Sequence, residues 1–171
     1  LINIPTSIID NVAHVTQSAA SSDLDYWQST LSRIDWLIFS DSILISLPFD
    51  PQAEFKHMLQ SYAVFAMVCS TLLNKSFTAG LPLRGGISVG EFFVEERCFA
   101  GKPIISALRA AQDLEMCGCI LDEEASNFIS LLRKDVVKSG DQNMLTMLDQ
   151  TTILYIPPTK EDTQERHRMI N

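Results

Sequence analysis

The feature that most constrains the fold is a long apolar segment over residues 55–73. Its large side chains recur at the three- and four-residue spacing of a helix, and smaller apolar residues between them extend the apolar surface almost all round. Such a helix needs cover on several sides, which either a large core or a partner subunit provides. The sequence is compatible with both explanations.

The chain has 171 residues, 46% of them hydrophobic and 20% charged, which is sufficient for one domain with its own core. Its net charge of −8 argues against a general binder of the nucleic-acid backbone, because such a binder needs a positive surface. A small anionic ligand stays compatible with this charge, since its binding depends on local groups. No apolar run reaches the roughly 18 residues of a membrane span, and no leader precedes a cleavage site. We expect a cytoplasmic protein with neither a nucleic-acid nor a membrane partner.

Four cysteines occur at spacings that fit neither a zinc knuckle nor a C-x-x-C motif. We expect free, buried thiols in a reducing compartment. They are Cys69, Cys98, Cys117 and Cys119.

Helix and strand patterns alternate along the chain. Helices are expected over residues 7–17, 26–34, 55–73, 102–114 and 123–137, with a polar break over 18–25. A hairpin is expected over 36–47, with strands over 83–94, 118–121 and 151–156, the last strand ending at a pair of prolines. Residues 138–150 carry no readable pattern, and the mixed charges of 159–168 suggest the start of a solvated helix. This mixture predicts a single α+β domain over 1–171, with an antiparallel sheet on one side and helices on the other.

Glycines interrupt the strand expected over 83–94, at Gly85, Gly86 and Gly90. A glycine inside a strand marks a bulge or a close approach of another backbone. Here the glycines would let the strand bend or let a subunit backbone approach. The neighbouring Arg84 offers a charge for a phosphate or for a structural carboxylate, and we favour the structural role.

Three segments, in this order, resemble parts of the class III nucleotidyl cyclase catalytic domain. FSDSILIS (39–46) resembles its metal-binding hairpin turn, LRGGISVGEFF (83–93) its R-x-G-I-x-x-G strand, and CFAGKPIISALRAAQDLE (98–115) the helix that a glycine opens. CILDEEASNFI, followed later by LYIPPTK, is similar to the closing strand–helix and terminal strand. The matches cover residues 36–160, and the pairing of SDS with RGGI is closest to the bacterial Pycsar-type pyrimidine cyclases.

The resemblance implies a ferredoxin-like (βαββαβ) cyclase core, a mainly antiparallel sheet covered by helices. It implies an enzyme that converts a nucleoside triphosphate, UTP or CTP in the Pycsar type, to the 3′,5′-cyclic monophosphate and pyrophosphate. Two subunits would meet head to tail as a homodimer, each site drawing residues from both. The cyclic product would activate a partner effector in bacterial anti-phage defence.

The resemblance makes Asp41 a ligand of the catalytic metals, Mg²⁺ or Mn²⁺ in a two-metal site. The alternative is an ordinary turn residue that makes an Asx hydrogen bond. The family's second metal-binding carboxylate stands in a first strand that this sequence does not match, so we expect that strand ahead of Leu1. A degenerate cyclase without a complete metal site is the other explanation, because Asp10 and Asp35 are poor substitutes.

Four further residues fall at functional positions of the family. Arg109 matches the arginine that stabilises the transition state, unless it is a surface residue paired with Asp113 one turn on. Ile105 falls where the ribose-orienting asparagine stands, and it cannot hydrogen-bond ribose. Leu37 and Cys98 fall at the base-reading positions, where Leu37 offers neither donor nor acceptor to a purine, unless it is simply a core residue of the strand.

Two other functions stay open on the sequence. A catalytically inactive cyclase-like domain would bind a nucleotide or a partner for regulation, which the isoleucine and the missing carboxylate favour. A structural α+β interaction domain would make the motif matches accidental.

Overall fold

The computed structural model describes residues 21–95, 98–160 and 165–171. The helix expected over 7–17, with Asp10, lies outside the described residues. The chain divides into two compact units, Leu1–Leu72 and Leu73–Asn171. The boundary between them falls inside one continuous helix, and each unit is described by itself.

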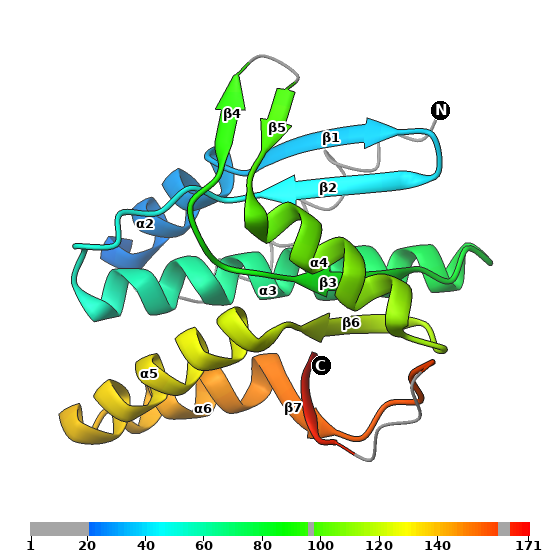
Figure 1. Ribbon diagram of the computed structural model, residues 1–171. Helices are drawn as coiled ribbons and strands as arrows, with labels where there is room; N and C mark the ends of the chain where they lie inside the picture. The colour runs from blue at the N-terminus through cyan, green and yellow to red at the C-terminus, as the bar shows by residue number, and fades with distance from the viewer. Residues whose placement is uncertain (1–20, 96–97, 161–164) are drawn as a thin grey trace. The chain divides into compact units, whose positions relative to one another are not determined.

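The first unit contains helix α2 (Ser21–Ser32), a ribbon of strands β1 (Asp35–Phe39) and β2 (Ser42–Ser46), and most of helix α3 (Phe55–Thr78) (Figure 1). The hairpin is confirmed, since β1 and β2 are antiparallel and Phe39 pairs with Ser42. The polar break expected over 18–25 is wrong from Ser21 onward. Residues 21–25 belong to helix α2.

The apolar segment of the sequence forms α3, which is confirmed as a helix and runs five residues beyond the expected end. Ten of its residues between Leu59 and Leu72 are buried in the chain itself, as a core requires. Two hydrogen bonds end the helix, from Gly80 N to the Phe77 carbonyl and from Leu81 N to the Ser76 carbonyl. With Gly80 at a φ of 78°, this is a Schellman cap, in which glycine avoids the strain of the left-handed conformation.

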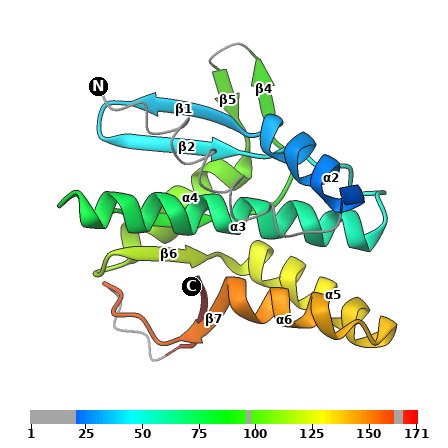
Figure 2. The same ribbon diagram turned by 180° about the vertical axis from the view of Figure 1, so that it is seen from behind.

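The second unit is built on a four-stranded sheet of order β3-β6-β8-β7. Its strands are β3 (Arg84–Ile87), β6 (Gly118–Leu121), β7 (Thr152–Tyr155) and β8 (His167–Ile170). Strands β3 and β6 are parallel, and the other two pairs are antiparallel. A separate ribbon joins β4 (Phe93–Glu95) to β5 (Cys98–Ala100), and three helices complete the unit: α4 (Lys102–Asp113), α5 (Glu123–Ser139) and α6 (Gln142–Thr151) (Figure 2).

Helix α4 packs directly on β3. A Cβ atom added at Gly86 would overlap the carbonyl group of Ala107. Of the two roles considered for the glycines, a bend and a close approach, Gly86 shows a close approach, and the approaching backbone is α4 of the same chain and not that of a second subunit. Arg84 donates from Nη1 to the Leu114 carbonyl at 2.7 Å, which is the structural role favoured from the sequence.

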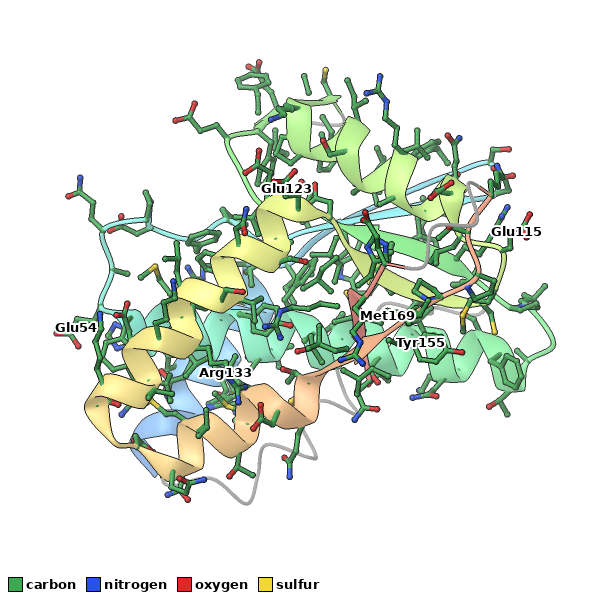
Figure 3. All side chains as sticks on the ribbon, turned by 60° about the horizontal axis from the view of Figure 1, so that its bottom comes forward. Glu54, Glu115, Glu123, Arg133, Tyr155 and Met169 are labelled. Atoms are coloured by element: carbon green, nitrogen blue, oxygen red, sulfur yellow. The ribbon has the colours of Figure 1, made fainter. Side chains whose placement is uncertain are left out.

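Helix α6 was not predicted, although it has a clear start signal. The Asp141 carboxylate accepts hydrogen bonds from Asn143 N and Met144 N and so caps the helix. Arg133 of α5 donates from Nη1 and Nη2 to the two carboxylate oxygens of Asp149 of α6, and Figure 3 shows Arg133 between these two helices. The helix has only ten residues, which is short for an argument from periodicity, although Met144, Leu145, Met147 and Leu148 stand at helical spacing.

Strand β8 corrects two expectations at once. It follows the strand that was expected to be the last, and it occupies part of the charged run that was expected to start a helix. It lies between β6 and β7, where Met169 and Ile170 are buried. A strand of four residues inserted between two others is fixed by those neighbours, so its own sequence carries little pattern.

The architecture is α+β, as predicted. The expectation of one antiparallel sheet differs from the structure, because the described strands form three separate sheets and β3–β6 is parallel. No helix in the described ranges is long and apolar enough to cross a membrane.

All four cysteines are free, as expected, but only two of them are buried. Cys69 and Cys119 lie inside, whereas Cys98 and Cys117 are exposed. Burial raises the pKa of the Cys119 thiol to about 12, which keeps it protonated and unreactive.

Candidate functional site

Asp41 lies at the tip of the β1–β2 ribbon, in a turn of two residues. Its side chain is exposed, and the first turn residue, Ser40, has a φ of 52°, the sense of twist that two-residue hairpin turns favour. The carboxylate accepts one bond, a weak one of 3.3 Å from the Ser42 hydroxyl. In an Asx turn the carboxylate accepts a bond from a main-chain N–H two residues on. Asp50 makes such a bond, from Gln52 N at 2.8 Å, and Asp41 does not. The Asp41 carboxylate is therefore open to a ligand.

Leu37 lies in β1, four residues before Asp41, and pairs with Leu44 of β2. Its side chain is half-buried. It presents only methyl groups, so it can support a ligand by contact but cannot read a base by hydrogen bonding.

Helix α4 starts at a position that only glycine fits. Gly101 has a φ of 156°, and a Cβ there would lie 2.9 Å from both the Glu91 carbonyl oxygen and the Phe92 Cα. Pro103 in the first turn favours the helical start. The helix axis is thus fixed at its beginning by close contacts with the segment after β3, as well as at Gly86 further along.

The two faces of α4 differ sharply. Ala107 and Ala110 face inward, against β3 and against the core cluster of Leu114, Ile120 and Met169. The opposite face is exposed and carries side chains at three- and four-residue spacing, namely Ile105, Leu108, Arg109 and Gln112.

Ile105 and Arg109 therefore lie one turn apart on one exposed surface. Ile105 is 55% exposed, and its neighbour Leu108 on the same face is 52% exposed. The expected alternative for Arg109, a pair with Asp113, is not formed, and within the described ranges Arg109 has no ion pair at all. Both side chains are free to meet a ligand or another subunit.

Cys98 opens β5, opposite Glu95 of β4, and is exposed. Asp41 and Leu37 thus belong to the first unit, and Arg109, Ile105 and Cys98 to the second. Lys102 at the start of α4 is bound to Glu124 at 3.0 Å.

Metal-ligating side chains do not cluster in the part of the chain that the structure describes. No group there brings together three or more histidine, cysteine, aspartate or glutamate side chains that could hold an ion. Asp41 supplies a hard oxygen ligand of the kind that Mg²⁺ and Mn²⁺ prefer. It fits such a metal in kind, but a pair of cations needs a second bridging carboxylate.

A hollow that the sequence did not suggest lies in the first unit, between α2, the segment after β2 and α3. Its volume is about 300 Å³, and it contains none of the five predicted site residues. The lining comes from positions spread over 36 residues of sequence, so only the packing of α2 on α3 gathers it. It is formed by Tyr26, Ser29, Arg33, Phe49, Asp50, Ala53, His57, Met58 and Ser61.

Comparison of the chain with protein-family models, with curated proteins and with solved structures found no match.

Proposed function

We propose that this protein is a nucleotidyl cyclase that converts a pyrimidine nucleoside triphosphate, UTP or CTP, to its 3′,5′-cyclic monophosphate and pyrophosphate. The observation that carries the proposal is that Asp41 and Arg109, which match charged functional positions of the cyclase family, are both exposed and make almost no polar contacts with the described residues of their own fold. Asp41 is exposed with one weak local bond, and Arg109 is exposed with no ion pair in the described ranges. Charged side chains that stabilise nothing in their own fold are candidates for a ligand.

The local structure of the motifs supports the same proposal. FSDSILIS forms a ribbon with its aspartate at the turn, RGGI forms a strand whose glycine admits a helix backbone, and Gly101 opens that helix. The resemblance to the cyclase family implies the same three elements for these motifs, namely a hairpin turn, a strand and a helix opened by a glycine.

The proposed reaction is an in-line displacement at the α-phosphorus. The ribose 3′-oxygen forms a bond to this phosphorus, the bond from the phosphorus to the bridging oxygen breaks, and pyrophosphate leaves with the electron pair while the 3′-hydroxyl loses its proton. The protein has to hold the two groups in line and to balance the charge that develops on the phosphoryl oxygens. The guanidinium of Arg109 suits the second task, because its planar fork can donate two parallel bonds to phosphoryl oxygens.

A divalent pair, Mg²⁺ or Mn²⁺, when bound would activate the attacking oxygen and neutralise the leaving group. Asp41 is the described residue that would hold it. The described residues supply one of the two carboxylates that such a metal pair requires.

Base selection in the proposal depends on Leu37 and Cys98. A leucine in place of a hydrogen-bonding residue removes the contacts that a purine edge requires. An apolar wall is compatible with a smaller pyrimidine ring held by other groups. We propose further that the protein acts as a head-to-tail homodimer, with Asp41 from one subunit and Arg109 from the other, and that its product activates an effector in anti-phage defence.

A second candidate function is a catalytically inactive cyclase-like domain that binds a nucleotide or a partner. Ile105 favours it, because an exposed isoleucine stands where the ribose should be oriented by a hydrogen bond.

One experiment separates the candidates. The protein, expressed from its complete reading frame, is incubated with each of the four nucleoside triphosphates and Mn²⁺, and products are separated by mass. A cyclic pyrimidine product supports the first function. Nucleotide-dependent thermal stabilisation without product supports the second function. If neither product nor stabilisation is found, an interaction domain is the function that is left.

A further inference from the structure

The hollow of the first unit has a rigid wall made by one tyrosine. Tyr26 of α2 donates its hydroxyl proton to the His57 carbonyl at 2.9 Å and so accepts from the Ser61 hydroxyl at 2.8 Å. Its ring also stacks on the His57 ring, with the centroids 4.8 Å apart. These contacts hold α2 beside α3 and keep the hollow open at about 300 Å³, the lower end of the range for small-molecule sites.

Arg33 brings a positive charge to this hollow and makes no ion pair with the described residues. Its Nη2 donates to the Thr30 hydroxyl at 3.1 Å and its Nη1 makes a long bond of 3.4 Å to the Pro48 carbonyl. Its Nε is buried and has no partner, and no carboxylate in the described ranges pairs with the guanidinium. A half-buried guanidinium held by two neutral oxygens is incompletely satisfied, because its geometry matches the two oxygens of a carboxylate or phosphate.

The remaining lining limits the shape and the charge of a ligand. Phe49, Ala53 and Met58 offer an apolar surface for its body, and the Ser29 hydroxyl is a second donor. Asp50 also lines the hollow, with one carboxylate oxygen held by Gln52 N. Its negative charge opposes a ligand of high charge such as a triphosphate.

We propose that this hollow is a binding site for a small organic anion, with a carboxylate or phosphate group on Arg33 and a compact apolar body against the apolar part of the lining. The site is separate from the proposed cyclase chemistry. Arg33 precedes β1 and Asp41 follows it, so the length of the strand, about 3.3 Å per residue, places them at opposite ends of the ribbon.

Titration calorimetry with phenyl phosphate tests the site, in EDTA so that no divalent metal contributes. The wild-type protein should bind one equivalent per chain, and Arg33→Gln should weaken binding by about tenfold or more, since a charge-assisted hydrogen bond is lost. Lys138→Gln removes the same charge from an exposed position of α5 and should leave the affinity unchanged. Benzyl alcohol, which has a similar body without the anion, should bind at least tenfold more weakly than phenyl phosphate.

A second variant keeps the test sharp if Arg33→Gln disturbs the fold. Ala53→Leu adds bulk to the apolar lining of the hollow without removing a charge. It should also lower the affinity for phenyl phosphate by about tenfold, because the larger side chain takes up space that the phenyl ring needs. Equal affinity in wild type, Arg33→Gln and Ala53→Leu, or no binding in the wild type, would overturn the proposal.

Discussion

Gly86 and Ala107 lie against each other so closely that no side chain fits between them. A Cβ at Gly86 would overlap the Ala107 carbonyl, and these are backbone atoms that no rotamer change can move. This contact presses α4, the helix that carries Ile105 and Arg109, onto β3. The orientation of the proposed catalytic arginine therefore depends on a glycine in the RGGI motif.

The substitution Gly86→Ala should destabilise the protein by about 2–3 kcal/mol, the usual cost of forcing atoms into a packed interior. Urea unfolding followed by circular dichroism measures it. Gly85→Ala is the matched control, because a Cβ there would meet the Cys119 Sγ at 3.1 Å, a side-chain atom that can yield. Equal losses in the two variants would contradict the close helix–strand contact.

Removal of the turn carboxylate should abolish turnover without harming the fold. Asp41→Ala is expected to leave the free energy of unfolding within about 0.5 kcal/mol of wild type, because the side chain is exposed and makes one weak bond. Cyclic product and melting temperature are measured together. Asp135→Ala, which removes an exposed carboxylate from α5, should keep full activity. Activity retained in Asp41→Ala would show that the ribbon does not hold the metal.

Arg109→Ala should lower kcat by about a hundredfold or more while changing KM less, since the proposed bond belongs to the transition state. Steady-state rates against triphosphate concentration give both constants. Lys138→Ala serves as a control for the loss of a surface charge. A change confined to KM would move Arg109 to ground-state binding.

The proposed shared site makes a prediction about mixtures. If Asp41 and Arg109 reach one nucleotide from different subunits, a heterodimer of Asp41→Ala and Arg109→Ala has one site with both changes and one site with neither. Random mixing of two inactive variants should then restore about a quarter of wild-type activity. A mixture as inactive as its components would mean that each site is built from one chain.

The buried thiol of Cys119 should contribute to alkaline unfolding. Its pKa is about 12 in the folded protein, against an ordinary value of 9.0, so the folded state keeps a proton that the unfolded state loses. Stability from this group is complete below pH 9 and falls as the pH rises from 9 towards 12. Between pH 8 and 10.5, Cys119→Ala should lose less unfolding free energy than wild type. Parallel curves would contradict the burial.

Thiol exposure can be checked directly. In the native protein Cys98 and Cys117 should react with a thiol reagent at pH 8, whereas Cys69 and Cys119 should react only after unfolding, because they are buried. Peptide mapping after labelling identifies the modified residues. Rapid labelling of Cys119 in the folded chain would be the opposite outcome.

Elements with a strong local pattern could be predicted from the sequence. Strand β6 was expected at its observed bounds, and α3, α4 and α5 were recognised from apolar spacing, although α3 ends five residues later. The two-residue turn at Asp41 followed from serines and an aspartate between apolar runs. In each case neighbours in sequence provide the signal.

Features that depend on contacts distant in sequence were missed. Strand β8 is set by the strands on either side of it. Helix α6 is only partly such a case, because its Asp141 cap is local in sequence and only its bond to Arg133 of α5 is distant. The hollow around Arg33 exists because Tyr26 joins two helices. No local sequence pattern predicts such a site, because its lining residues form no motif in the sequence.

Formation of a cyclic nucleotide by this protein can be measured directly. The complete protein is incubated with UTP, CTP, ATP and GTP in equal amounts with Mn²⁺, and the products are identified by mass and by comparison with 3′,5′-cyclic standards. The account predicts a cyclic pyrimidine monophosphate with one pyrophosphate released for each, and neither product from the Asp41→Ala variant. Absence of any cyclic nucleotide, from a protein that is folded by circular dichroism, would contradict it.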